Sequence, residues 1–266
     1  MRLLPGMAPT PGAPPPVDRD ARRRGLALQV GVAFASPKAD EDAMARLLHV
    51  AAQLEDHGAR SLWLDVTGVP PDGSGLDAAL AIVRRTATLE VWVGVAPEAE
   101  RRATLRLAEM AQLVGGRVGT VLVVGDGDGH AGADRLPAAK PTSAWVAGGP
   151  QAAAFAAARG ARWLAAGTEP QAALRAAVAA EDRGIGRPAD CLGAVVRSAL
   201  ARGELTDGEI GATGPTSLRI LLERYIAVGA SQLVLDPAAS DLGRWTHDVC
   251  AQVTDLDSIE PAPCGC

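Results

Sequence analysis

The residues whose types could do chemistry gather in a glycine-rich loop that begins after the apolar run at residues 121–124. The loop contains three glycines in G-x-G-x-x-G spacing and three possible metal ligands: Gly127, Gly129, Gly132, Asp126, Asp128 and His130. The glycine spacing is that of a dinucleotide-binding turn, in which a helix starts at the third glycine and its N-terminus holds a pyrophosphate. The two aspartates and the histidine could together bind a metal ion.

The local sequence argues against both kinds of site. Pro137 and Pro141 follow the last glycine of the loop and prevent a good helix there, so a pyrophosphate site is not expected. An EF-hand-like calcium loop starting at Asp126 would need its bidentate glutamate at the position of Pro137. A solvated turn after a strand is favoured, because D-G repeats are common in such turns. A metal cluster of Asp126, Asp128 and His130 is the weaker alternative.

Length, composition and charge limit the class of protein. The 266 residues suffice for one large domain or two small ones, and 48% hydrophobic with 21% charged residues is a globular composition. No apolar run approaches the roughly 20 residues that a transmembrane helix needs, and prolines interrupt the N-terminus where a secretory signal would be apolar. A cytoplasmic protein without a membrane partner is therefore predicted. A net charge of −5 argues against nucleic acid as a partner.

Strand-like and helix-like segments alternate after a proline- and arginine-rich leader, residues 1–25, which is predicted to be disordered. Eight segments are predicted as buried strands: 26–34, 61–65, 90–95, 120–125, 143–149, 162–167, 190–198 and 231–236. Helices are predicted at about 40–57, 76–87, 98–114, 150–159, 169–183, 216–228 and 240–253. Gly58, Gly160 and Gly229 each stand just before a strand and are predicted to end a helix as a left-handed cap.

Eight apolar strands separated by helices predict an α/β fold with a closed (β/α)8 barrel at residues 26–254, since an open doubly wound sheet usually has five or six strands. Residues 255–266 are predicted to form a mobile tail. In such barrels the active site lies at the C-terminal ends of the strands. Besides the glycine-rich loop, these ends carry Asp65, Arg197 and Asp236.

Five segments of the chain match a series of family motifs in the same order. They are HGARSLWLD at 57–65, VWVGVAP at 91–97, QLVGGRVGTVLVVGDG at 112–127, WVAGGPQAAAFAAARGARWLAAG at 145–167 and DRGIGRP at 182–188. With them the chain resembles the luciferase-like monooxygenases, oxidoreductases that use a flavin or the deazaflavin F420 on a TIM barrel. The likeness covers most of residues 26–236, and the order of the motifs is more specific than any one of them. It implies hydride transfer or monooxygenation of a small organic substrate with F420 or FMN.

The resemblance also implies which residues hold the cofactor: Val95, Ala96, Gly125, Gly148, Gly149, Gly167 and Thr168. The first two would flank the flavin ring, and the last four would offer backbone N–H groups and one hydroxyl to its phosphate. A tight strand-to-helix turn explains the two glycines Gly148 and Gly149 equally well. Family members often have a cis peptide after the third strand, which here corresponds to the bond between Ala96 and Pro97. They often form homodimers through the early helices, here 40–57 and 76–87.

The sequence departs from the family where catalysis is expected. Only residues 126–142 connect the fourth and fifth strands, so the fourth helix is expected to be absent or reduced, with no long insertion. Val66 stands where the family often has a histidine, and the first strand ends without an acid or base. The catalytic candidates are therefore Asp65, Asp126 and His130, although Asp65 could equally cap a turn. A cofactor-free barrel that serves as a binding or accessory subunit is the alternative function.

The C-terminal cysteines allow a separate hypothesis, a zinc site made of His247, Cys250, Cys264 and Cys266. The C-x-C spacing is shorter than the usual C-x₂₋₄-C, which argues against it. A redox-active thiol pair is slightly more plausible, and an incidental tail is favoured over both. No metal is therefore predicted.

Overall fold

Eight parallel strands close into a barrel in this computed structural model, which describes residues 29–36, 41–66, 75–125, 144–181, 192–199, 211–237 and 242–250. The strands follow one another in chain order around the barrel, and β9 closes it by pairing with both β7 and β1. They are β1 (Gln29–Phe34), β2 (Ser61–Leu64), β3 (Glu90–Val95), β4 (Val118–Val123), β5 (Trp145–Gly148), β6 (Arg162–Ala166), β7 (Leu192–Ala199) and β9 (Gln232–Pro237). All eight predicted strands are confirmed, and the fold is a TIM barrel.

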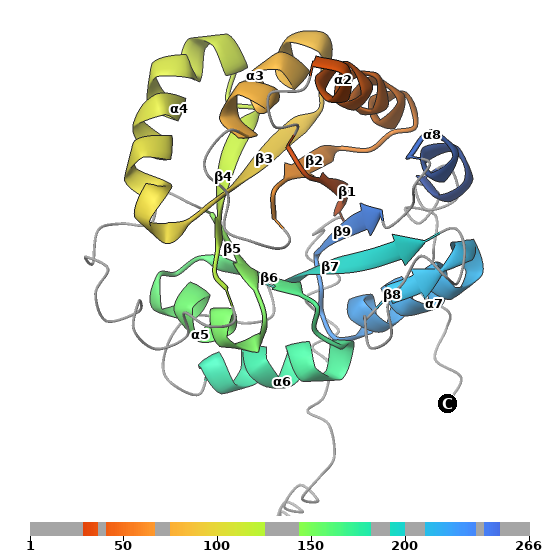
Figure 1. Ribbon diagram of the computed structural model, residues 1–266. Coiled ribbons are helices and arrows are strands. Elements are labelled where there is room, and N and C mark those ends of the chain that lie inside the picture. The colour runs from red at the N-terminus through yellow and green to blue at the C-terminus, as the bar shows by residue number, and fades with distance from the viewer. Residues whose placement is uncertain are drawn as a thin grey trace, which may run out of the picture.

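The helices form a ring around the outside of the barrel (Figure 1). They are α2 (Glu41–Asp56), α3 (Gly75–Arg85), α4 (Glu100–Val114), α5 (Pro150–Ala158), α6 (Pro170–Glu181), α7 (Gly214–Ala227) and α8 (Leu242–Trp245), with a 3₁₀ turn η1 (Pro97–Ala99) before α4 and a π-helical turn η3 (Thr246–Cys250) after α8. The last two elements replace the single helix predicted at 240–253. Residues 1–25, the 126–143 connection and the tail at 255–266 lie outside the described residues, so their predictions stay predictions. No helix within the described ranges has both the length and the apolar content needed to cross a bilayer.

Strand residues alternate between two separate cores, because successive side chains of a strand point to opposite faces of the sheet. In β2, Leu62 and Leu64 pack in the outer core between barrel and helices, whereas Trp63 points into the barrel. The same alternation in β9 puts Leu233 and Leu235 outside and Val234 inside. Both cores are apolar, which explains why the strands have nearly continuous apolar sequences.

Tryptophans fill the interior of the barrel. Trp63 stacks on Trp92 with ring centroids 5.5 Å apart, and its edge meets Trp145 at 5.7 Å. Glycines on neighbouring strands make room for these rings: a Cβ at Gly31 would lie 2.5 Å from Trp63 Nε1, and a Cβ at Gly119 would lie 2.5 Å from the Trp92 ring. The barrel is therefore closed by a packed interior and is not a pore.

A short ninth strand, β8 (Gly211–Thr213), was not predicted. It pairs with β7 from Arg197 to Ala199, beyond the point where β6 stops pairing at Val195. Since β9 also pairs with Arg197 and Ser198, β8 must take the edge of β7 that β6 leaves open. The C-terminal part of β7 is thus paired on both edges, and we call this three-stranded extension of the barrel wall the lip.

Two local predictions have different outcomes. Gly58, Gly160 and Gly229 have φ of 83°, 64° and 96°, which confirms the predicted left-handed caps. The cis peptide at Ala96–Pro97 is wrong, since the described residues contain no cis bond. Ala96 is extended, with φ −67° and ψ 148°, and leads directly into η1, where a trans proline suits the first helical position.

Candidate functional site

Three charged side chains stand at the C-terminal mouth of the barrel, each two residues beyond an interior residue of its strand. Asp65 follows Trp63, Arg197 follows Val195 and Asp236 follows Val234, and all three preceding residues belong to the interior core. Because strand side chains repeat every two residues, Arg197 and Asp236 face the barrel axis just above that core. Asp65 comes directly after β2 ends, so its direction is set by its own backbone and partners.

Asp65 is held by the end of β1. Its Oδ1 accepts a hydrogen bond from the Ser36 backbone N–H at 2.7 Å, and its Oδ2 accepts one from the Ser36 hydroxyl at 2.5 Å. Asp65 is the one non-glycine residue with positive φ in the described ranges, at 53°. Its carbonyl oxygen lies over Gly94, where a Cβ would be only 2.1 Å away. Strained backbone of this kind persists only where the surroundings enforce it, and it is frequent at functional sites.

The second polar feature is an ion pair at the base of the lip. Arg197 Nη1 lies 2.8 Å from Asp236 Oδ2, and the two residues are direct register partners on β7 and β9. The Asp236 side chain is 13% exposed and the Arg197 side chain 39% exposed. The carboxylate is thus the buried partner, and much of the guanidinium side chain faces solvent.

Gly148 and Gly149 connect β5 to the N-terminus of α5. Gly148 accepts a hydrogen bond from Trp163 Nε1 at its carbonyl, and a Cβ on it would lie 2.7 Å from the Val124 carbonyl oxygen. Close packing therefore requires glycine at position 148 whether or not a ligand binds. Gly149 is the N-cap of α5, and Pro150 at the first helical position donates no N–H.

The turn after β6 is anchored from outside the barrel. The buried Tyr225 hydroxyl of α7 donates a hydrogen bond to the Thr168 carbonyl. Burial raises the pKa of Tyr225 to about 12, and the Glu169 charge raises it further. The Thr168 hydroxyl donates to the Ala166 carbonyl at 3.1 Å, and Thr168 is 3% exposed, so in this arrangement its proton is not offered to a ligand. Gly167, in contrast, is exposed, with a φ of 59° and open space around its Cα.

The end of β3 is buried. The Val95 side chain packs in the outer core toward the helices, so only its backbone could approach a ligand in the mouth. Ala96 is 5% exposed. Gly125, at the end of the fourth strand segment, is half-buried. Asp126, Asp128 and His130 lie outside the described residues.

The structure therefore brings together a pair that the sequence did not predict and one whose partnership it did not assign. Ser36 was not a candidate, although a serine and an aspartate at the ends of adjacent first and second strands are a usable signal. Arg197 and Asp236 were noted as strand-end residues without a role. Asp65, Gly148, Gly149 and Gly167 are all placed at strand ends on the predicted side of the barrel, and their roles stay predictions.

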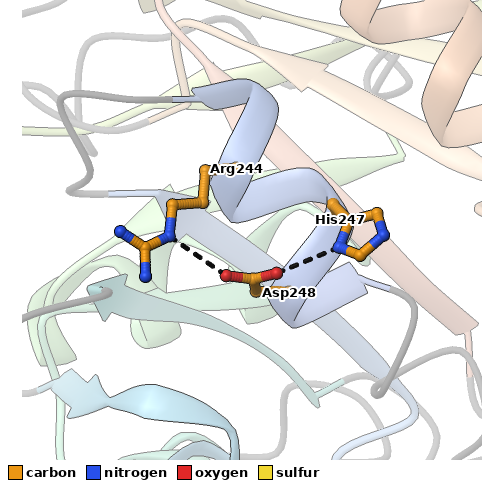
Figure 2. Close-up of polar contacts among 3 residues, drawn as sticks. All are labelled: Arg244, His247 and Asp248. Carbon is orange, nitrogen blue, oxygen red and sulfur yellow. Dashed lines mark hydrogen bonds and ion pairs between the residues drawn. The ribbon is translucent and has the colours of Figure 1, made fainter.

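The surface cluster of Arg244, His247 and Asp248 lies on α8 and η3 (Figure 2). Asp248 accepts hydrogen bonds from Arg244 Nε at 3.2 Å and interacts with His247 Nδ1 at 3.0 Å (Figure 2). The hydrogen bond with His247 and then the one with Arg244 lower the pKa of Asp248. Cys264 and Cys266 lie outside the described residues, within which no three metal-ligating side chains gather. The zinc hypothesis stays untested.

Comparison with known proteins adds evidence on the fold. No protein-family model matches the chain, and no curated protein matches it. Among solved structures, an F420-dependent secondary alcohol dehydrogenase in complex with an F420-acetone adduct is similar at 12% identity and a TM-score of 0.61, covering 85% of this chain and 99% of that one. A riboflavin lyase with modified FMN and riboflavin is similar at 12% identity and a TM-score of 0.59, covering 90% of this chain and 94% of that one. Likeness at this identity shows a shared TIM-barrel fold.

Proposed function

We propose that the chain is an oxidoreductase that uses F420 or FMN to convert a small organic substrate at the C-terminal mouth of the barrel. The observation that carries the proposal is the strained Asp65, held by two hydrogen bonds from Ser36 at this mouth. The two solved structures support the choice of cofactor, because one is F420-dependent and the other holds modified FMN.

The residues around the mouth fit such a cofactor through their backbone. Gly149 caps the N-terminus of α5, where backbone N–H groups and the helix dipole favour a phosphate. Gly167 is exposed in open space on the neighbouring turn. The side chains of Val95, Ala96 and Thr168 are buried and contribute no exposed surface to a ring or a phosphate. We therefore assign phosphate contacts to the backbone at Gly148, Gly149 and Gly167.

The protein's part in the reaction is to bind and orient. The cofactor, when bound, supplies hydride-transfer or oxygen chemistry. Asp65 keeps its carboxylate in a fixed position because Ser36 holds both oxygens. An ionised carboxylate has about four lone-pair sites, so each oxygen can accept one more hydrogen bond from a substrate hydroxyl. Asp65 would thus orient that hydroxyl and take its proton at Oδ1 or Oδ2.

The alternative, a cofactor-free binding or accessory barrel, is favoured by one observation. Three of the seven residues implied as cofactor ligands have buried side chains: Val95, Ala96 and Thr168. A barrel that had lost its cofactor could fill the former ring position in this way.

A homodimer through α2 and α3 stays part of the proposal. The large exposed apolar side chains of the described residues lie elsewhere, on α4 and α7: Leu105, Leu113 and Ile220. Analytical ultracentrifugation tests the dimer.

Titration of the purified protein with FMN and with F420, followed by absorbance and fluorescence, tests the oxidoreductase. Saturable binding of one cofactor by the wild type and by Asp65→Asn, with loss of substrate turnover in that variant, is the expected result. Asp77→Asn is the control, because Asp77 is exposed on the outer helix α3. Absence of binding of either cofactor to a barrel that is folded by circular dichroism would sink the oxidoreductase and favour the accessory role.

A further inference from the structure

The ion pair at the base of the lip has the geometry of an oriented arginine. Asp236 lies on β9 beside Arg197, and its Oδ2 contacts Nη1 at 2.8 Å. On its other edge, Arg197 is the register partner of Gly211 in β8. The backbone that carries Arg197 is therefore fixed on both edges, and Asp236 restricts its side chain from below.

Exposure separates the two partners. Asp236 is 13% exposed and sits just above Val234, which is fully buried in the interior core. Arg197 is 39% exposed at its side chain, although Val195 directly below it is 6% exposed. The positive partner is thus the one that a molecule entering the mouth meets first.

We propose that Arg197 binds an anionic group, a phosphate or a carboxylate, of the molecule that occupies the mouth. A guanidinium presents its donors in a planar fork that matches both groups, and a fixed guanidinium loses less side-chain entropy on binding. The inference rests on the proposed function for the place of the ligand. It adds that the ligand is recognised by its negative charge at the lip.

The other charges near the mouth set the balance of this interaction. Asp236 opposes an incoming anion, but it is mostly buried and already neutralised by Arg197. Asp65 is also negative, and the Ser36 N–H and hydroxyl stabilise its charge. The anion therefore replaces water on the outer side of the guanidinium while Asp236 stays on the inner side.

The shared chemistry has two possible sources, the phosphate of a cofactor and an anionic group of a substrate. Riboflavin has the ring of FMN without its phosphate, so the ratio of FMN to riboflavin affinity isolates the first source. Titration with inorganic phosphate and with acetate, followed by the Nε–H signal of Arg197 in ¹⁵N NMR spectra, tests the site without any flavin.

Arg197→Gln and Arg197→Lys are the test variants, and Arg106→Gln is the matched control. Arg106 also pairs with an aspartate, Asp77 at 2.5 Å, and is 46% exposed, but it lies on the outer helix α4. For the first source, we expect Arg197→Gln to reduce FMN binding roughly tenfold or more without changing riboflavin binding, since a hydrogen bond between charged groups is worth this much. Arg197→Lys should recover only part of the loss because it keeps the charge without the fork.

For the second source, FMN and riboflavin bind alike, but phosphate or acetate shifts the Arg197 signal saturably in the wild type and in Arg106→Gln. The proposal is overturned if neither arm depends on Arg197 in variants that unfold at the wild-type temperature. If flavins and F420 do not bind at all, the proposed cofactor fails, and the phosphate and acetate titrations still decide the role of Arg197.

Discussion

Replacing Glu55 with glutamine perturbs a contact that connects α2 to the start of β3. The Glu55 carboxylate accepts hydrogen bonds from three consecutive backbone N–H groups, those of Ala87, Thr88 and Leu89, at 2.6 to 3.0 Å. The Thr88 hydroxyl donates a fourth at 2.8 Å. Each of these donors gains from the negative charge, which glutamine lacks.

The magnitude follows from the pKa. Burial alone would raise the pKa of Glu55, but the hydrogen bonds from Thr88, Ala87 and Leu89 outweigh it and lower the pKa from 4.5 to about 2. By linkage this shift corresponds to about 3 kcal/mol at neutral pH. Water reaches the carboxylate and screens it, so we expect Glu55→Gln to lower the free energy of unfolding by about 1–2 kcal/mol.

The dependence on pH gives the sharper test. Because the pKa of Glu55 is lower in the folded state, its contribution is complete above pH 4.5 and is lost as the pH falls toward 2. Urea unfolding at pH 7, 5, 4 and 3 should therefore show the wild type and Glu55→Gln converging at low pH. Glu109→Gln, an exposed change on α4, should leave the wild-type curve unshifted. A constant difference between wild type and Glu55→Gln at every pH would refute the reasoning.

Three further predictions test the barrel and its mouth. Tyr225 is the single tyrosine of the chain, so absorbance at 295 nm should show its ionisation near pH 12 rather than 10; since burial raises its folded pKa, stability should decline as the pH rises from 10 to 12, and a folded protein that titrates at 10 contradicts the buried hydroxyl. Gly31→Ala should cost roughly 1–3 kcal/mol in urea unfolding, because its Cβ would meet Trp63 Nε1 at 2.5 Å, and an unchanged midpoint would show that the ring can move. Ser36→Ala should cost about 1–2 kcal/mol by removing the hydroxyl from Asp65, whereas Ser36→Thr should recover part of it, and equal stability of all three proteins would exclude a structural role for the contact.

The strands of the barrel could be predicted because their sequences carry the fold directly. Both faces of each strand are buried, which gives the apolar runs, and Gly58, Gly160 and Gly229 mark the helix ends by the backbone that only glycine adopts easily. β8 escaped prediction because it has three residues and one buried side chain. Its pairing depends on an edge of β7 that β6 leaves open, and this follows only from strand lengths in three dimensions.

The contacts within the candidate site needed the register of the barrel. Asp65 was predicted from its place after an apolar strand, but its partner Ser36 depends on the alignment of β1 with β2. Arg197 and Asp236 are 39 residues apart in sequence, and only the pairing of β7 with β9 makes them neighbours. The expected cis bond failed for a local reason, because Pro97 starts η1 and is accommodated there in the trans form.

The two ends of the barrel use charge differently, and this separates stability from function. Glu55 and Arg117 bracket the turn before β3, where Glu55 binds its N–H groups and Arg117 binds the Val83 and Thr86 carbonyls at 2.5 and 3.1 Å. All partners there are backbone groups of the chain itself, so this end has a structural task. At the mouth, Asp65 and Arg197 are each held by one neighbouring strand and are partly open on the other side. Changes at the first end should therefore alter unfolding without altering ligand affinity, and changes at Arg197 should do the reverse.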